Sequence, residues 1–216
     1  REEQIKFAES LAEKLSKQGK KPYIARGIHE DHIGYDAIAY VHCIIEIFEQ
    51  LQKRKIEPEY IYVASSDSTY AGLLFGAEYM DSPIKIIAIN PMREIIRAQT
   101  NYERISNICK KVSEILNIEI EIKPQNINMI PDYVGNGYGF LTPECKHAIN
   151  IVANNEGIYL DPVYTGKAMA ALIDHISIGK FSKKSIVIFI HTGGGPIIFA
   201  YADELGFGSK FISKKS

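Results

Sequence analysis

The chain has 216 residues, of which 46% are hydrophobic and 24% are charged, and its formal net charge is −1. This composition is typical of a globular protein with one good-sized core, or with one large domain and part of a second. The balanced charge argues against a nucleic-acid partner and against electrostatic attachment to a membrane.

No apolar stretch is as long as a membrane-spanning helix, and the charged first residues do not form a secretory signal. The three cysteines are far apart and form no C-x-x-C pair, so neither a disulfide framework nor a zinc site is indicated. We therefore expect a cytoplasmic protein with reduced thiols. The first residue is Arg1 rather than Met, which we interpret as typical of a fragment or a processed chain.

The predicted elements alternate between helices and strands. An amphipathic helix at residues 2–17 is followed by a short strand at residues 21–25 and by a loop with Gly27 and Gly34. Further helices are expected through residues 41–51, at 69–80, between 93 and 116, at 144–154 and at 166–178. Further strands are expected at 60–64, 84–89, 118–122 and 186–190. Apolar strands that alternate with helices predict an α/β fold, with a mostly parallel sheet covered on both faces by helices.

Hydroxyl residues gather where the strand at residues 60–64 gives way to the next helix. Ser66, Ser68 and Thr69 lie in this turn, and Ala71 and Gly72 would let the helix pack close to the sheet. Free amides and the positive end of a helix dipole favour a phosphate group at such a corner. A hydroxyl-rich helix cap explains the same residues, and from this stretch alone it is the preferred interpretation.

A second motif, GNGYGFLTPE at residues 135–144, has three closely spaced glycines around Tyr138. Glycines permit positive φ angles and a tight backbone path, so this turn can present Tyr138 from a fixed position. Packing of the phenol at a domain edge is the structural alternative.

Two stretches near the end of the chain place hydroxyl groups at ends of predicted elements. DPVYTGKAM puts Tyr164 and Thr165 before a helix, and FIHTGG puts Thr192 and Gly193 after the last strand. Ligands of α/β proteins sit at the carboxyl ends of strands, so both stretches indicate a small-molecule site. The sequence His29-Glu-Asp-His32 has metal-binding side chains, but no distant third ligand is suggested, and we interpret it as a polar loop without a metal.

Together, these motifs resemble the pyridoxal-phosphate enzymes of the D-cysteine desulfhydrase and 1-aminocyclopropane-1-carboxylate deaminase family, which have the tryptophan-synthase-β-like fold (fold type II). The similarity begins near Lys21 and is densest between Gly135 and Tyr201. It implies that residues 1–26 are a remnant of a small domain and that residues 27–216 are the large cofactor-binding domain. The chain would lack the N-terminal third that carries the Schiff-base lysine.

The resemblance also implies a role for each candidate residue. Ser66, Ser68 and Thr69 would hold the cofactor phosphate, and Thr192 would bond the pyridine nitrogen. Gly193 would let the ring approach the backbone, and Tyr138 and Tyr164 would contact the substrate. Thr165 stands where the deaminases carry a glutamate, as it does in the desulfhydrases, and Lys167 is interpreted as structural.

The resemblance implies a lyase that eliminates sulfide from D-cysteine or a related β-substituted amino acid, with pyruvate and ammonia as the other products. The lysine would come from outside this segment, so the segment alone is expected to be inactive. Opening of a cyclopropane ring and a non-catalytic binding or partner protein are the alternatives. Asp67, where the family usually has a small neutral residue, favours the non-catalytic alternative. A homodimer is expected, possibly with a separate N-terminal fragment, and neither nucleic acid nor membrane is an expected partner.

Overall fold

A computed structural model describes residues 2–24, 32–92 and 98–207. The helices are α1 (Glu2–Lys17), α2 (His32–Arg54), α3 (Ser68–Tyr79), α4 (Ala98–Leu116), α5 (Pro143–Glu156), α6 (Thr165–Ser177) and α7 (Ala202–Leu205). The strands are β1 (Tyr60–Ala64), β2 (Lys85–Ile89), β3 (Asn128–Ile130) and β4 (Val187–Ile190). Short 3₁₀ turns, η2 and η3, span Pro124–Asn126 and Gly195–Tyr201.

The four strands form one parallel sheet in the order β3-β2-β1-β4. Val63 of β1 stands opposite Ala88 of β2 on one side and Ile190 of β4 on the other. The carboxyl ends of these three strands therefore lie next to one another at one edge of the sheet, which is the edge where α/β folds bind ligands.

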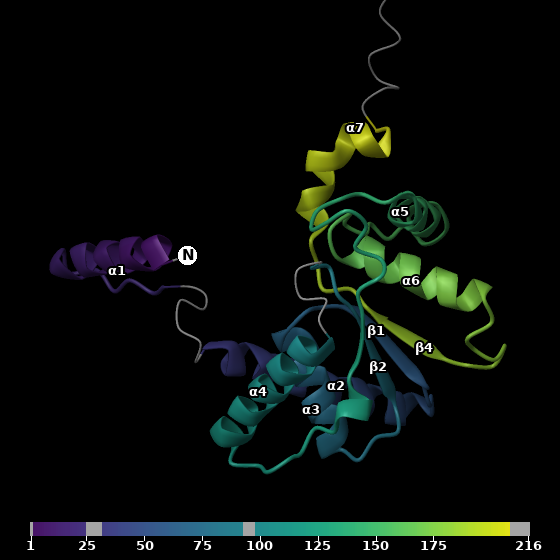
Figure 1. Cartoon of the computed structure of the whole chain (residues 1–216), viewed down its shortest axis with the longest axis horizontal. Coiled ribbons are helices and arrows are strands. Elements are labelled where there is room, and N and C mark those ends of the chain that lie inside the picture. Colours follow the sequence, from purple (N-terminus) through teal and green to yellow (C-terminus); the bar gives the residue numbers. More distant parts are fainter. Residues whose placement is uncertain (1, 25–31, 93–97, 208–216) are drawn as a thin grey trace, which may run out of the picture.

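Alternate residues of each strand bury against different helices, as the pleat of a strand requires. Ile61 and Val63 join the core formed with α2, α3 and α4, whereas Tyr62 and Ala64 pack against α6. Figure 1 shows the two groups of helices on opposite sides of the sheet, with α2, α3 and α4 on one side and α5 and α6 on the other. This confirms the expected α/β architecture with helices on both faces.

Helix α3 is buried all the way round from Tyr70 to Ala77, because it lies between the sheet and other helices. A Cβ atom on Gly72 would lie 2.0 Å from the carbonyl oxygen of Ala37 in α2, and one on Gly76 would lie 2.3 Å from Ile44 Cγ2. The expectation that Gly72 serves contact with the sheet is therefore wrong, since this glycine permits the close approach of α2.

Helix α1 forms over the predicted residues and lies apart from the layered body (Figure 1). Phe7 and Leu11 on this helix are exposed. The expected strand at residues 21–25 is not formed at residues 21–24, where no neighbouring strand of the described chain offers hydrogen bonds. The expected domain boundary at residue 26 falls outside the described residues. No described helix combines the length and the hydropathy needed to cross a bilayer.

The expected strand at residues 118–122 is also wrong. The burial alternates as predicted, with Ile122 buried and Glu119 and Glu121 exposed, but the segment joins no sheet. Its isoleucines pack into the core beside α4, and the sheet edge next to β2 is taken instead by β3. Alternation of apolar and polar residues indicates that one side of an extended segment is buried. It does not indicate that a neighbouring strand forms hydrogen bonds with that segment.

Candidate functional site

The turn between β1 and α3 is held by its own side chains. Ser65 is buried, and its Oγ accepts hydrogen bonds from the amides of Asp67 at 3.3 Å and Tyr70 at 3.1 Å. Asp67 is the N-cap of α3, and its Oδ1 accepts from the amide of Ser68 at 2.8 Å. The corner is thus a capped helix start, as the structural interpretation of the sequence expected.

The corner also keeps polar groups for a ligand. The side chains of Ser66, Ser68 and Thr69 are half-buried here. Within the described chain, no backbone oxygen accepts from the amide of Thr69, which is one of the first amides of α3. An amide of this kind at the positive end of a helix favours an anion.

The carboxylate of Asp67 is paired rather than isolated. Its second oxygen, Oδ2, accepts from Nη2 of Arg104 in α4 at 3.0 Å. Both side chains of the pair are about 40% exposed, 39% for Arg104 and 38% for Asp67. The start of α3 therefore contains both the carboxylate of Asp67 and a cation, Arg104, that is paired with it.

Strand β4 ends at Ile190, next to the end of β1, and a short loop of tight geometry follows. The exposed His191 bridges two segments, because its Nε2 bonds the carbonyl of Tyr159 at 2.9 Å and its Nδ1 accepts from the amide of Gly193 at 3.1 Å. Thr192 between them is exposed. Gly193 has a φ of 104°, and nothing lies within 4 Å of a Cβ placed on it. The loop therefore leaves open space beside its backbone.

The start of α6 is organised by Asp161, which is completely buried. Oδ1 accepts from the amides of Val163 at 2.8 Å and Tyr164 at 2.7 Å, and Oδ2 accepts from the amide of Thr165 at 2.8 Å. The carboxylate thus satisfies three backbone donors at the N-terminus of the helix, where a negative charge is favourable.

Thr165 points into the same network. Its side chain is fully buried, its hydroxyl donates to Oδ2 of Asp161 at 2.6 Å, and it accepts from the amide of Asp161 at 2.9 Å. The described contacts of this hydroxyl are therefore with Asp161 and fix the turn that carries Tyr164.

The glycine-rich loop presents Tyr138 beside α6. Gly135 and Gly139 have φ angles of 70° and 77°, as the glycines of this motif permit, whereas the third glycine of the motif, Gly137, does not have a positive φ. Tyr138 is half-exposed, its hydroxyl hydrogen-bonds that of Tyr164, and the two ring centroids are 5.9 Å apart. The carbonyl of Gly139 accepts from the hydroxyl of Tyr201 at 2.6 Å, which ties the loop to η3.

Lys167 of α6 binds the backbone just before this loop. Its side chain is 1% exposed, and its Nζ donates to the carbonyl of Val134 at 2.8 Å. Burial lowers the pKa of Lys167, and the nearby Cys145 and Asp161 oppose that shift. These contacts agree with the structural role expected for Lys167.

The loop after β4 lies directly against the start of α6, since a Cβ on Gly194 would meet Oδ2 of Asp161 at 2.8 Å. The ends of β1 and β4, the start of α6 and the glycine-rich loop therefore meet at one edge of the sheet. These segments carry all the predicted site residues: Ser66, Ser68, Thr69, Tyr138, Tyr164, Thr165, Thr192 and Gly193. Among these residues, the hydroxyl of Thr165 is bound to a neighbouring buried carboxylate, that of Asp161.

Sequence reasoning missed three residues that shape this edge: Asp161, His191 and Arg104. Asp161 carried a usable signal, because an aspartate shortly before a helix is a typical capping residue. The ion pair of Arg104 with Asp67 joins residues that are 37 positions apart, and no local sequence pattern predicts it.

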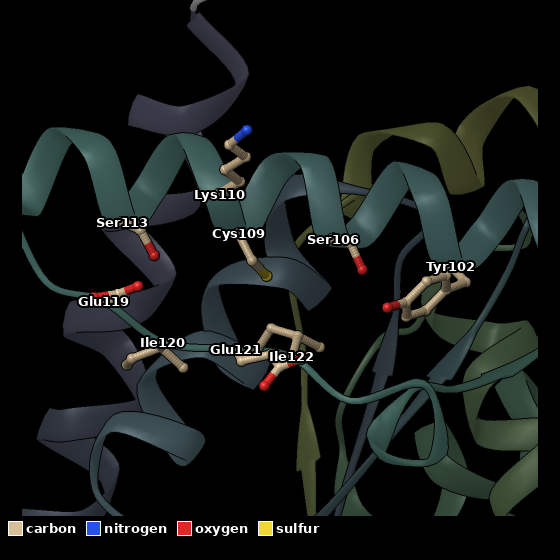
Figure 2. Close-up of a pocket in the computed structure, with 9 residues that line it drawn as sticks. All are labelled: Tyr102, Ser106, Cys109, Lys110, Ser113, Glu119, Ile120, Glu121 and Ile122. Carbon is tan, nitrogen blue, oxygen red and sulfur yellow. The ribbon is translucent and has the colours of Figure 1, made fainter.

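The structure also contains a groove of about 430 Å³ between α4 and residues 119–122 (Figure 2). Cys109 faces it, but burial raises the pKa of this thiol to about 12, and its Sγ bonds the carbonyl of Ala71. The hydroxyls of Ser106 and Ser113 are buried without a partner in the described chain. The groove therefore offers no activated nucleophile, and the described residues contain no group of three or more His, Cys, Asp or Glu that could hold a metal.

Comparison with known proteins agrees with the geometry. Residues 2–193 match the family described as "Pyridoxal-phosphate dependent enzyme". A D-cysteine desulfhydrase of Serratia proteamaculans is 36% identical over 196 residues, which are 90% of this chain and 57% of that protein. A putative 1-aminocyclopropane-1-carboxylate deaminase of Pyrococcus abyssi is 34% identical over 204 residues, which are 94% of this chain and 59% of that protein.

Among solved structures, a crystal structure described as that of "the ACC deaminase homologue" superposes with a TM-score of 0.76 at 33% identity. It covers 94% of this chain, and this chain covers 58% of it. The chain thus spans less than two thirds of the length of these relatives, and the fold is that of the tryptophan-synthase-β-like enzymes, fold type II. The cofactor of this family is pyridoxal 5'-phosphate. The chain belongs to the family of pyridoxal-phosphate dependent enzymes.

Proposed function

We propose that the chain is the cofactor-binding part of a lyase that eliminates sulfide from D-cysteine or a related β-substituted amino acid. Pyruvate and ammonia would be the other products. The observation that carries the proposal is the hydrogen-bonded pair of Tyr138 and Tyr164 beside the end of β4. The 36% identity with a D-cysteine desulfhydrase supports the choice of substrate.

The residues present fit the cofactor. The amide of Thr69 and the hydroxyls around it suit the phosphate group at the start of α3. Gly193 has open space where a Cβ would otherwise stand, and this suits the close approach of a flat ring. The exposed hydroxyl of Thr192 is the group that would hold the ring nitrogen.

Once bound, the cofactor supplies a sink for the electrons left at the substrate Cα. A neutral threonine such as Thr192 at the ring nitrogen would stabilise less positive charge on the ring than a carboxylate would, and this would suit early departure of the thiolate. The phenols of Tyr138 and Tyr164 orient the substrate, and their shared hydrogen bond gives a route for one proton between the two oxygens. Asp161 and Thr165 keep Tyr164 in place.

The lysine that attaches the cofactor would come from a segment outside these 216 residues. Lys167 is the lysine nearest to the proposed reacting groups in sequence, and its amino group is bound to the carbonyl of Val134. A complete protein would therefore combine this chain with a lysine-bearing segment, and we propose that it assembles as a homodimer. Light scattering during size-exclusion chromatography measures the mass of the complete protein and so tests whether it is a dimer.

The experiment is an assay of sulfide release from D-cysteine by the protein that includes the lysine-bearing segment. Replacement of Tyr164 or Tyr138 by Phe should lower kcat by about 100- to 10,000-fold, because a positioned acid or base contributes on that order. Tyr159→Phe is the matched control, since this exposed tyrosine uses only its backbone carbonyl in the contacts described. Cofactor binding without any sulfide would reject elimination from D-cysteine.

Ring opening of 1-aminocyclopropane-1-carboxylate is the second candidate, because the relatives include putative deaminases at 34% identity. Thr165 speaks against it, since its buried hydroxyl is bound to Asp161 and offers no free acid. An assay with the cyclopropane substrate decides between the two reactions. Binding of the cofactor with turnover of neither substrate would favour the non-catalytic alternative.

A further inference from the structure

Asp67 places a carboxylate where α3 would otherwise hold an external anion. Oδ1 accepts from the amide of Ser68 at 2.8 Å, and Oδ2 accepts from Nη2 of Arg104 at 3.0 Å. The side chain therefore uses the two attractions that a phosphate group would use at this corner: a helix amide and a nearby cation.

Arg104 is equipped to bind more than Asp67. A guanidinium group has five N–H donors in a planar fork, and the one directed at Asp67 belongs to Nη2. Its Nε is buried and has no acceptor among the described residues. The Nε–H donor of Arg104 is therefore not satisfied by the described residues.

The charges favour an exchange of partners. A phosphate monoester carries roughly −1.5 to −2 charges at neutral pH, so an unpaired Asp67 beside it would repel it. Arginine binds phosphate oxygens in a bidentate manner and does not lose its proton. A guanidinium group that is already at the helix start can therefore serve either anion.

We propose that Arg104 is a phosphate-binding residue of this chain and that Asp67 is its resting counter-ion, which gives up the guanidinium when phosphate binds. The inference rests on the proposed function, because the phosphate in question is that of pyridoxal 5'-phosphate. The family usually has a small neutral residue where this chain has Asp67. The inference explains Asp67 as part of a modified phosphate site that has gained a cation, and not as a sign that the site has been lost.

The test is a fluorescence titration, at fixed ionic strength, of the protein that includes the lysine-bearing segment, with pyridoxal 5'-phosphate and, separately, with pyridoxal, which has no phosphate. Asp67→Asn keeps a capping side chain and removes the competing charge, so the Kd for the phosphate ester should fall about tenfold. Arg104→Gln should raise that Kd about tenfold or more. Neither change should alter the weaker binding of pyridoxal.

The double variant separates a phosphate ligand from a mere partner of Asp67. If Arg104 contacts phosphate, Arg104→Gln will still weaken binding about tenfold in the Asp67→Asn background. If it serves only to neutralise Asp67, the loss will vanish in that background, and the inference is overturned. Glu103→Gln and Lys110→Gln, which remove one charge each from exposed positions of α4, should leave both constants unchanged.

Failure of the inference is distinguishable from failure of the proposed function. Binding of the phosphate ester that is insensitive to Arg104 would overturn the inference and leave the proposed function standing. Absence of binding of either ligand by the wild type and by every variant would overturn the proposed function and the inference with it.

Discussion

At the scale of single residues, the candidate site depends on Asp161, a buried carboxylate that does not face solvent. A buried charge is costly unless it is fully hydrogen-bonded. Asp161 meets this condition with the amides at the start of α6 and the hydroxyl of Thr165. It also lies against the backbone of Gly194, so one side chain links the loop after β4 to the helix that carries Tyr164.

Asp161→Ala should therefore lower the free energy of unfolding by about 2–4 kcal/mol, because it leaves several buried donors without an acceptor. Asp161→Asn keeps one carbonyl oxygen and should cost less. Urea unfolding measures both, and Asp132→Ala, at an exposed carboxylate, is the control. A loss at Asp161→Ala no larger than that of the control would contradict this account of the helix start.

A second buried polar contact lies on the same face of the sheet. The hydroxyl of Tyr62 hydrogen-bonds Nδ1 of His175 at 2.6 Å, and both side chains are buried. Burial raises the pKa of Tyr62 to about 12, so the phenol keeps its proton at neutral pH. Burial lowers the pKa of His175, Lys180 lowers it further, and Asp174 opposes the shift.

Stability should therefore depend on pH through His175. Because the folded pKa lies below the unfolded value of about 6.5, the unfolded chain binds the proton more readily. The contribution of His175 is complete above the unfolded pKa and is lost as the pH falls through the lower folded pKa. The free energy of unfolding should accordingly drop more steeply on acidification in the wild type than in His175→Gln. His147→Gln, at an exposed histidine of α5, should keep the wild-type slope.

At the scale of elements, the crossing of α2 and α3 is set by glycines. Gly72 and Gly76 lie one turn apart on α3 and face the backbone and Ile44 of α2. This close packing buries α3 and holds its first turn, with the hydroxyl corner, at the edge of the sheet.

Gly72→Ala should destabilise the protein by about 3 kcal/mol or more, because the clash is with a backbone carbonyl, which cannot turn away as a side chain could. The better helix propensity of alanine returns only about 0.5–1 kcal/mol. Thermal unfolding of Gly72→Ala and of Gly195→Ala gives the comparison. A Cβ on Gly195 meets nothing within 4 Å, so that variant should unfold near the wild-type temperature.

The elements that could be predicted from the sequence are those whose pattern is local. The strand at residues 60–64 and the helix at residues 2–17 form where hydrophobic spacing placed them. Residues 118–122 and β3 were not predicted correctly, because membership of a sheet depends on a neighbour elsewhere in the chain. Asn128–Ile130 is too short and too polar at its start to be distinguished from a loop.

The same limit applies to the site. Hydroxyls and glycines at the ends of elements could be predicted, since strand ends meet at one edge of a parallel sheet. The hydrogen bonds of Thr165 could not, because they depend on the fold of the turn around Asp161. The ion pair of Asp67 with Arg104 joins two helices, so it could not be predicted from a local pattern either. Because of this pair, the charge of Asp67 is neutralised by a neighbour and is not an isolated negative charge.

At the scale of the whole molecule, β4 is the outermost strand on its side of the sheet among the described residues, and its four apolar residues are only half-buried. An apolar edge strand can pair with further polypeptide through its hydrogen-bonding groups. The relatives are longer, since this chain covers 57–59% of them. We propose that a complete active site would combine the edge described here with residues outside these 216.

The last prediction concerns covalent attachment of the cofactor. Lys167 has a lowered pKa, which is the usual property of a lysine that attacks a carbonyl group. Its geometry is against that role, because Nζ is buried and donates to the carbonyl of Val134 at 2.8 Å. Incubation of the 216-residue chain with pyridoxal 5'-phosphate, followed by borohydride reduction and mass spectrometry, should therefore leave Lys167 unmodified.

The same experiment on a protein that includes the lysine-bearing segment should yield one adduct per chain, located in that segment. Tyrosines, threonines and the helix start would then hold the cofactor, while the added segment supplies the amine. A stoichiometric adduct on Lys167 would show instead that the loop held by Val134 opens. In that event, the chain would contain its own attachment point and would need no second segment for it.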